Sequence, residues 1–219
     1  MHDRIIRGGT VVDGSGRQAF SADVAIDGGR ISAVGNLRKA TAKEVIDADG
    51  LLVAPGWVDI HTHYDGQVTW DPLLTPSCWH GVTSVVMGNC GVGFAPAAPD
   101  RREWLIGLME GVEDIPGTAL AEGIRWAWES FPEYLDAIER RPLAIDVGAQ
   151  IAHGAVRAFV MGERGAKNEP ATAGGRTRTA WASCARACAT GHARTPVTSS
   201  ARVPSAVLRE RREAELIAS

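Results

Sequence analysis

A nearly continuous apolar run at residues 51–60, LLVAPGWVDI, constrains the fold of this chain more than any other feature. Such runs are typical of strands that are buried on both faces in a parallel sheet. Two further apolar or β-branched runs follow at residues 83–87 and 143–149. Helix signals lie between these runs. The order strand, helix, strand, helices, strand predicts the opening of a parallel α/β sheet or barrel.

The helix signals are short capping motifs. Asp100 with Glu103, and Ser130 with Glu133, have the spacing of a capping box, in which the two side chains bond backbone N–H groups at the start of a helix. We therefore expect one helix to begin near Asp100 and another near Ser130. The first of them should stop at Pro116, because proline cannot continue a helix.

Residues 1–50 carry strand signals and no helix signal. The segment Asp27-Gly28-Gly29 separates two β-branched stretches and indicates a hairpin, because glycine tolerates positive φ. Residues 44–47 alternate between polar and apolar types, as a half-buried strand does. The sequence predicts a small antiparallel sheet over residues 1–50, followed by the α/β units over residues 51–170.

The composition excludes several classes of protein. At 219 residues and 45% hydrophobic content, the chain can bury a sizeable core. No apolar run reaches membrane-spanning length, and the N-terminus lacks the apolar core of a signal peptide. Four cysteines without such a signal predict free thiols in a reducing compartment, so we expect a cytoplasmic protein without a membrane partner. The net charge of −3 gives no indication of a nucleic-acid partner.

Residues 171–219 differ in character from the rest of the chain. Eight Arg and three Glu give them a formal charge of +5, which leaves −8 for residues 1–170. Ala, Arg, Thr, Ser and Gly dominate, and neither helical nor strand periodicity is present. A change of reading frame in a GC-rich gene produces this composition. We predict a boundary near Pro170 and a frameshifted, poorly ordered tail rich in Arg and Ala.

Two other interpretations of the tail stay open. Its arginines could form an arm that binds nucleic acid, although no aromatic residues or basic helix support this. Cys184, Cys188 and His192 could suggest a zinc knuckle, although structural zinc needs four ligands and no partner motif is near. A solvated or unstructured segment agrees better with the composition.

Candidate metal ligands follow the first apolar run. His61 and His63 are two residues apart, and in extended backbone such residues point to the same face, so both imidazoles can reach one ion. Imidazole is a preferred zinc ligand. The alternative is a pair of solvated loop histidines. Because the pair ends an apolar strand, we favour a metal site.

Cys90 and His153 end the second and third predicted strands. In a parallel sheet Cys90 would lie beside the histidine pair, where a thiolate is a strong zinc ligand. The alternative for Cys90 is a small buried apolar residue. His153 would face the same site and could bind substrate, or it could be a hydrogen-bonded core histidine.

These motifs resemble those of the metal-dependent amidohydrolase superfamily. Residues 53–63, VAPGWVDIHTH, are similar to its first-strand signature. Residues 81–91, GVTSVVMGNCG, are similar to the second-strand motif of its N-acyl-D-amino-acid deacylase (D-aminoacylase) branch. The resemblance covers roughly residues 4–170, which is well under half of a complete enzyme of the barrel type.

The resemblance implies a β-sandwich, built from both chain ends, packed on a (β/α)₈ TIM-type barrel that holds one or two Zn²⁺ ions. His61 and His63 match the first-strand metal ligands and Cys90 matches the ligating cysteine. In the family the metal activates the water that attacks the acyl carbon of an N-acyl-D-amino acid, the small-molecule partner. Residues 1–50 would then be part of the sandwich and residues 51–170 the first β/α units.

The sequence departs from this pattern after the third predicted strand. The family pattern requires two later histidines and a late aspartate, but Asp146 is the last aspartate and His192 the only histidine after His153. We therefore expect an incomplete barrel and a truncated, inactive hydrolase of linear amide bonds. The alternatives are another amidohydrolase branch, similar to dihydroorotase or hydantoinase, and a non-catalytic zinc-binding fragment.

Overall fold

The computed structural model describes residues 1–113, 115–170 and 207–208. By its contacts the chain divides into two compact units, with the change from the first to the second after Trp57. No helix among the described residues is both long and apolar enough to cross a membrane. The predicted frameshifted tail, including Cys184, Cys188 and His192, lies outside the described residues except for residues 207–208.

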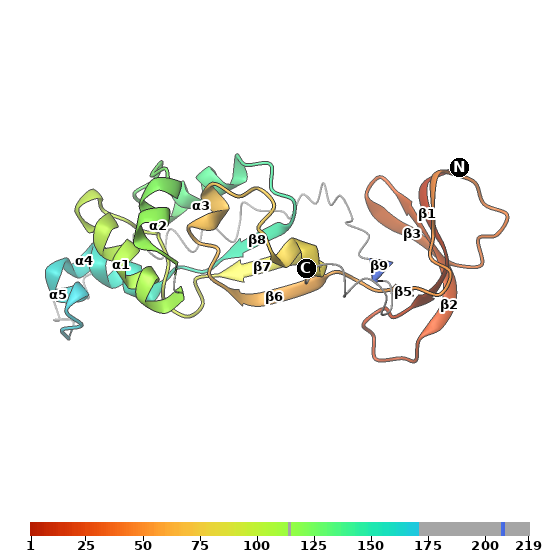
Figure 1. The fold of residues 1–219 in the computed structure, drawn as a ribbon, viewed down its shortest axis with the longest axis horizontal. Coiled ribbons are helices and arrows are strands. Elements are labelled where there is room, and N and C mark those ends of the chain that lie inside the picture. Colours follow the sequence, from red (N-terminus) through yellow and green to blue (C-terminus); the bar gives the residue numbers. More distant parts are fainter. Residues whose placement is uncertain (114, 171–206, 209–219) are drawn as a thin grey trace, which may run out of the picture. The chain divides into compact units, whose positions relative to one another are not determined.

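The first unit is a single mixed sheet whose strands run in the order β3-β2-β1-β5-β9, with β4 also paired to β1 (Figure 1). Strands β1, β2 and β3 form an antiparallel meander. The strands are β1 (His2–Val11), β2 (Phe20–Asp27), β3 (Arg30–Gly35), β4 (Ala42–Asp47), β5 (Leu52–Val53) and β9 (Val207–Leu208).

The antiparallel prediction for residues 1–50 is right for the meander and wrong for β4. Both β4 and β5 pair in parallel with β1, along the same edge. The link after β3 returns the chain to the free edge of β1. Buried Asp23 stabilises this path, because its carboxylate accepts hydrogen bonds from the backbone N–H groups of Gly8 (2.8 Å) and Leu37 (2.9 Å).

The second unit contains a three-stranded sheet in the order β6-β7-β8 (Figure 1), with β7 and β8 parallel. Its strands are β6 (Trp57–Thr62), β7 (Val82–Met87) and β8 (Asp146–Ala149). Its helices are η1 (Gln67–Thr69), η2 (Ser77–His80), η3 (Pro99–Arg101), α1 (Arg102–Glu113), α2 (Gly117–Gly123), α3 (Phe131–Glu139), α4 (His153–Met161) and α5 (Glu163–Ala166). The α/β class predicted from the sequence is confirmed.

The apolar run at residues 51–60 is not one strand buried on both faces, so that prediction is wrong. The run breaks at residues 54–56, where proline removes a backbone donor, and β5 and β6 join different sheets. Within the described structure β6 is an edge strand, and Trp57 (59%), Val58 (61%) and Ile60 (69%) are exposed.

The two capping predictions have different outcomes. The Ser130–Glu133 capping box is present at the start of α3. Asp100 forms no cap, because residues 99–101 form a 3₁₀ turn that leads directly into α1. Pro116 separates two helices, since α2 begins at the next residue.

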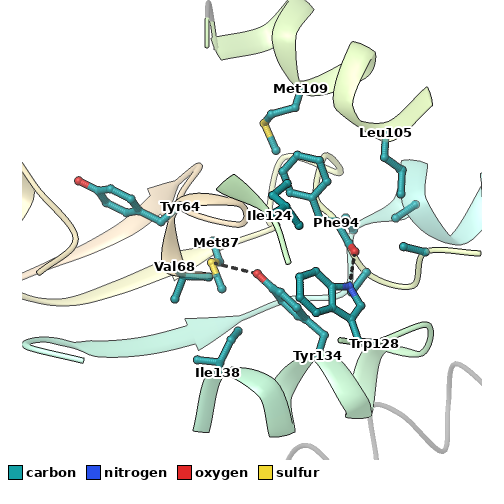
Figure 2. Packing of buried hydrophobic residues seen from close by; sticks show 14 of the residues in the cluster. Tyr64, Val68, Met87, Phe94, Leu105, Met109, Ile124, Trp128, Tyr134 and Ile138 are labelled. Carbon is teal, nitrogen blue, oxygen red and sulfur yellow. Dashed lines mark hydrogen bonds between the residues drawn. The ribbon is translucent and has the colours of Figure 1, made fainter. Parts of the chain in front are cut away.

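The core of the second unit lies between the sheet and helices α1 to α3 (Figure 2). Two buried side-chain donors, one from α3 and one from the segment before it, bond the loops that follow β6 and β7. The Trp128 indole N–H donates to the backbone oxygen of Phe94 (2.7 Å), and the Tyr134 hydroxyl donates to that of Asp65 (2.7 Å). Because buried polar groups are costly unless paired, these bonds fix the loops against the core.

The first prediction concerns the carboxylate of Asp71. It accepts hydrogen bonds from the Gln67 side chain, from the backbone and hydroxyl of Thr75, and from the backbone of Leu73. Burial acts to raise the pKa of Asp71, but these bonds outweigh it and lower the pKa to about 2. Since the folded-state pKa lies below the unfolded value, the carboxylate stabilises the fold above about pH 4, and this contribution is lost as the pH falls toward 2.

We expect Asp71→Asn to lower the free energy of unfolding at pH 7 by on the order of 1 kcal/mol, once solvent screening is allowed for. The difference from wild type should shrink between pH 4 and pH 2, as measured by urea unfolding. Asp136→Asn, on the exposed side of α3, is the matched control and should change little. A difference that stays constant down to pH 2 would contradict the prediction.

The second prediction concerns Gly88, directly after β7. Its φ is +85°, and a Cβ atom there would lie 2.2 Å from the backbone oxygen of Gln150. That oxygen cannot move freely, because the N–H of Gln150, the residue after β8, donates to the backbone oxygen of Met87 (2.8 Å). Gly88→Ala should therefore destabilise the fold by about 2 kcal/mol or more in thermal unfolding.

Gly107→Ala is the control for this substitution. Gly107 lies within α1 with open space around its Cα, so alanine should stabilise the protein by about 0.5–1 kcal/mol. Equal effects of the two alanines would show that the contact between Gly88 and Gln150 does not constrain the end of β7.

Candidate metal centre

The structure brings His61, His63 and Cys90 together at one end of the second sheet. One ligand atom from each residue lies within 4.8 Å of the other two. The Cys90 Sγ is 3.5 Å from Nε2 and 3.8 Å from Nδ1 of His63, and the two imidazole centroids are 5.4 Å apart. His61 and Cys90 are exposed, while His63 is largely buried.

Hydrogen bonds between the ends of β6 and β7 hold this arrangement. The Asn89 side chain donates to the backbone oxygen of Ile60 (2.6 Å), and the Thr62 hydroxyl donates to that of Val86 (3.0 Å). Thr62 is buried between the two histidines in sequence, so strand alternation directs both imidazoles to the opposite side. The ends of the two strands are thereby fixed next to each other.

The donor set fits a zinc ion. Zinc binds imidazole nitrogen at about 2.0–2.1 Å and thiolate sulfur at about 2.3 Å, so two such ligands of one tetrahedral ion lie about 3.5 Å apart. The 3.5 Å between Cys90 Sγ and His63 Nε2 agrees with that spacing. Among the described residues, two imidazoles and one thiolate form the cluster, which is fewer than the four ligands that a structural zinc site requires.

The sequence analysis missed two carboxylates, of which one contacts the cluster and the other lies near the first. Glu113 Oε1, at the end of α1, is 3.2 Å from His63 Nε2. Asp65 is buried, and its Oδ2 atom has no hydrogen-bond partner among the described residues. Burial raises the pKa of Asp65 to about 7, and the negative charge of Glu113 adds to the rise. In the sequence, only the spacing of Glu113 four residues after buried Met109 indicates that its side chain lies on the buried side of α1.

His153 is not part of the cluster. It is the first residue of α4 and is exposed, because β8 ends at Ala149 rather than continuing toward it. The start of α4 nevertheless lies against the loop after Cys90, since the N–H of Gly154 donates to the backbone oxygen of Gly91 (2.8 Å). A substrate-binding role for His153 stays a prediction.

Comparison of the sequence with known proteins finds one matching family and similar enzymes. Residues 44–216 match the model of the amidohydrolase family. The chain is 37% identical over 159 residues to a D-aminoacylase of Alcaligenes xylosoxydans xylosoxydans, which covers 73% of this chain and 31% of the relative. It is 39% identical over 163 residues to the N-acyl-D-aspartate deacylase of the same organism, which covers 74% of this chain and 30% of the relative.

A solved structure is similar as well. The N-acyl-D-glutamate deacylase of Bordetella bronchiseptica, described as a complex with zinc and a phosphonate inhibitor, matches with a TM-score of 0.63 and 30% identity, over 83% of this chain and 34% of that one. The chain therefore spans about a third of the length of the relatives it matches. With the family model matching most of its residues, the chain belongs to the amidohydrolase family.

Proposed function

We propose that this chain carries part of the zinc centre of a metal-dependent hydrolase that cleaves the amide bond of N-acyl-D-amino acids. One observation carries the proposal: two imidazoles and one thiolate, from two neighbouring strands, converge within 4.8 Å. The similarity to deacylases of D-amino acids supports the substrate class. A zinc ion at this position would polarise the substrate carbonyl and activate water.

The residues of the candidate site differ in exposure, and we assign their roles accordingly. Exposed His61 and Cys90 leave the open side of the cluster accessible to a small molecule. Largely buried His63 anchors the cluster to the protein. His153, on the helix that lies against the loop after Cys90, is the proposed contact for the substrate. Its imidazole would donate a hydrogen bond to the acyl or carboxylate group.

In this proposal β6, β7 and β8 are the first strands of a (β/α)₈ barrel, and the first unit is part of a β-sandwich. The parallel pairing of β7 with β8 supports the barrel, as do the ligands at the ends of β6 and β7. The match to the Bordetella deacylase structure, at a TM-score of 0.63, supports it as well.

The third prediction concerns zinc binding. The purified chain should bind zinc weakly, because three ligands without the rest of their surroundings hold a metal poorly. With Co²⁺ as the probe, coordination by Cys90 should give a thiolate-to-metal charge-transfer band in the near ultraviolet. Cys90→Ser should abolish the band, and His61→Ala should weaken binding by at least tenfold.

Cys78→Ser is the matched control, because Cys78 is also a free thiol but lies outside the cluster. It should leave both the band and the affinity unchanged. Loss of the band in Cys78→Ser, or its persistence in Cys90→Ser, would contradict the assignment of the ligands.

The fourth prediction concerns turnover. With added zinc, the isolated chain should hydrolyse N-acetyl-D-aspartate, N-acetyl-D-glutamate and apolar N-acetyl-D-amino acids at a rate close to background. The reason is that groups which act as a catalytic unit fail together when some are missing. Amine release measured over hours, with hydantoin and dihydroorotate as comparison substrates, tests both the activity and the branch. Zinc-dependent turnover by a monodisperse sample would overturn the expected inactivity, and turnover of a cyclic substrate would favour the alternative branch.

A further inference from the structure

We propose that Asn89 is a positioning residue of the metal centre, whose side chain holds the Cys90 thiol against His61 and His63. The inference rests on the proposed function, because Cys90 is one of the three candidate ligands. The Asn89 side chain acts through the backbone, since its amide donates to the carbonyl oxygen of Ile60 (2.6 Å), the residue directly before His61. One side chain thus joins the two strand ends that carry the ligands.

Cys90 itself lies beyond the end of the sheet. Strand β7 ends at Met87, and residues 88–91 form a turn in which the Gly91 N–H donates to the backbone oxygen of Gly88 (3.2 Å). Cys90 is one of the two central residues of this turn. Because backbone pairing fixes the strands and not the turn that follows, the sheet alone does not determine where the thiol lies relative to β6.

Glycines at both ends of the turn increase this freedom. Gly88 has a φ of +85° and Gly91 a φ of +90°. Glycine has more conformational freedom to lose on folding than any other residue. Contacts from outside the turn must therefore select the single orientation that places Cys90 beside the histidines.

Two hydrogen bonds from outside the turn provide such contacts. The N–H of Gly154, at the start of α4, donates to the backbone oxygen of Gly91 (2.8 Å). The second is the bond from Asn89 to Ile60. The first joins the turn to a helix that carries none of the three ligands, and the second joins it to β6, where His61 lies. Of the two bonds, the one from Asn89 sets the thiol relative to the imidazoles.

The exposure of Asn89 favours this role over a purely structural one. Its bond to Ile60 lies at an exposed position, where water can replace either partner, so the bond adds little to the stability of the fold. Buried Thr62 makes another bond between the same strands, to the backbone oxygen of Val86 within β7. The bond from Thr62 holds the two strands in register, and the bond from Asn89 orients the turn beyond them.

The spacing of the ligand atoms indicates what this orientation achieves. Cys90 Sγ is 3.5 Å from His63 Nε2, which is close to the separation of two ligands on one tetrahedral ion. Without the bond from Asn89, the histidines would keep their positions, because Thr62 still fixes the register of β6, whereas the thiol could turn away. Asn89 therefore determines whether the centre binds metal through two imidazoles alone or through two imidazoles and a thiolate.

The test compares Asn89→Ala with Asn36→Ala, using Co²⁺ as the probe. Asn36 is the matched control, because it is an exposed asparagine in the first unit, where its side chain accepts a bond from the N–H of Arg38 (3.3 Å). We expect Asn89→Ala to weaken Co²⁺ binding about tenfold or more. At saturating Co²⁺ its thiolate-to-metal band should fall toward that of Cys90→Ser, although the thiol is still present. Asn36→Ala should match wild type in both.

Two measurements on the metal-free chain accompany this comparison. Nuclear Overhauser contacts between the Cys90 β protons and the His63 ring protons should appear in wild type and disappear in Asn89→Ala. Contacts between Thr62 and Val86 should appear in both. The thermal unfolding midpoint of Asn89→Ala should lie within about 2 °C of wild type, as expected for an exposed position.

The outcomes separate this inference from the proposed function. If the wild-type chain binds no Co²⁺, the proposed function fails, while the contact between Cys90 and His63 in the metal-free chain still decides the role of Asn89. If Co²⁺ binds and Asn89→Ala keeps the wild-type affinity, band and contact, the positioning role is wrong and the metal site stands. If Asn89→Ala also loses the contacts between Thr62 and Val86, the bond supports the whole sheet, and a specific role in placing the thiol is wrong.

Discussion

The relative position of the candidate metal ligands depends on the hydrogen bonds that join the ends of β6 and β7. Asn89 donates across to the Ile60 carbonyl and Thr62 to the Val86 carbonyl, so the two strand ends stay in one relative position. Without them a shift of one residue in β6 would turn both imidazoles to the other side of the sheet. The register of one strand pair is thus a condition for any metal chemistry here.

The core beneath the sheet supports this register from the helical side. Val85 and Met87 of β7 are fully buried and belong to the same hydrophobic core as Leu105 and Met109 of α1. Figure 2 shows Met87, Leu105 and Met109 in this core. Tyr134 then connects α3 to the loop after His63 through the Asp65 carbonyl. The loop after His63 is thereby tied to α3, whose buried side chains pack in the same core as those of β7 and α1.

Much of the fold followed from local patterns. The hairpin at Gly28-Gly29 and the capping box of Ser130 and Glu133 depend on neighbours within a few residues, and both form as predicted. The two histidines and Cys90 were also predictable as a group, because strand alternation and parallel order are regular. The family itself followed from residues 53–63 and 81–91.

The features that only the tertiary structure decided depend on contacts between distant segments. The parallel pairing of β4 with β1, the exposure of β6 and the start of α4 at His153 each depend on which element occupies a neighbouring position. Spacing from Met109 places Glu113 on the buried side of α1, but no local pattern shows that its partner is His63 on another element. The sequence by itself determined which residue types end each strand. Folding decided which side chains meet, because that depends on packing across the whole core.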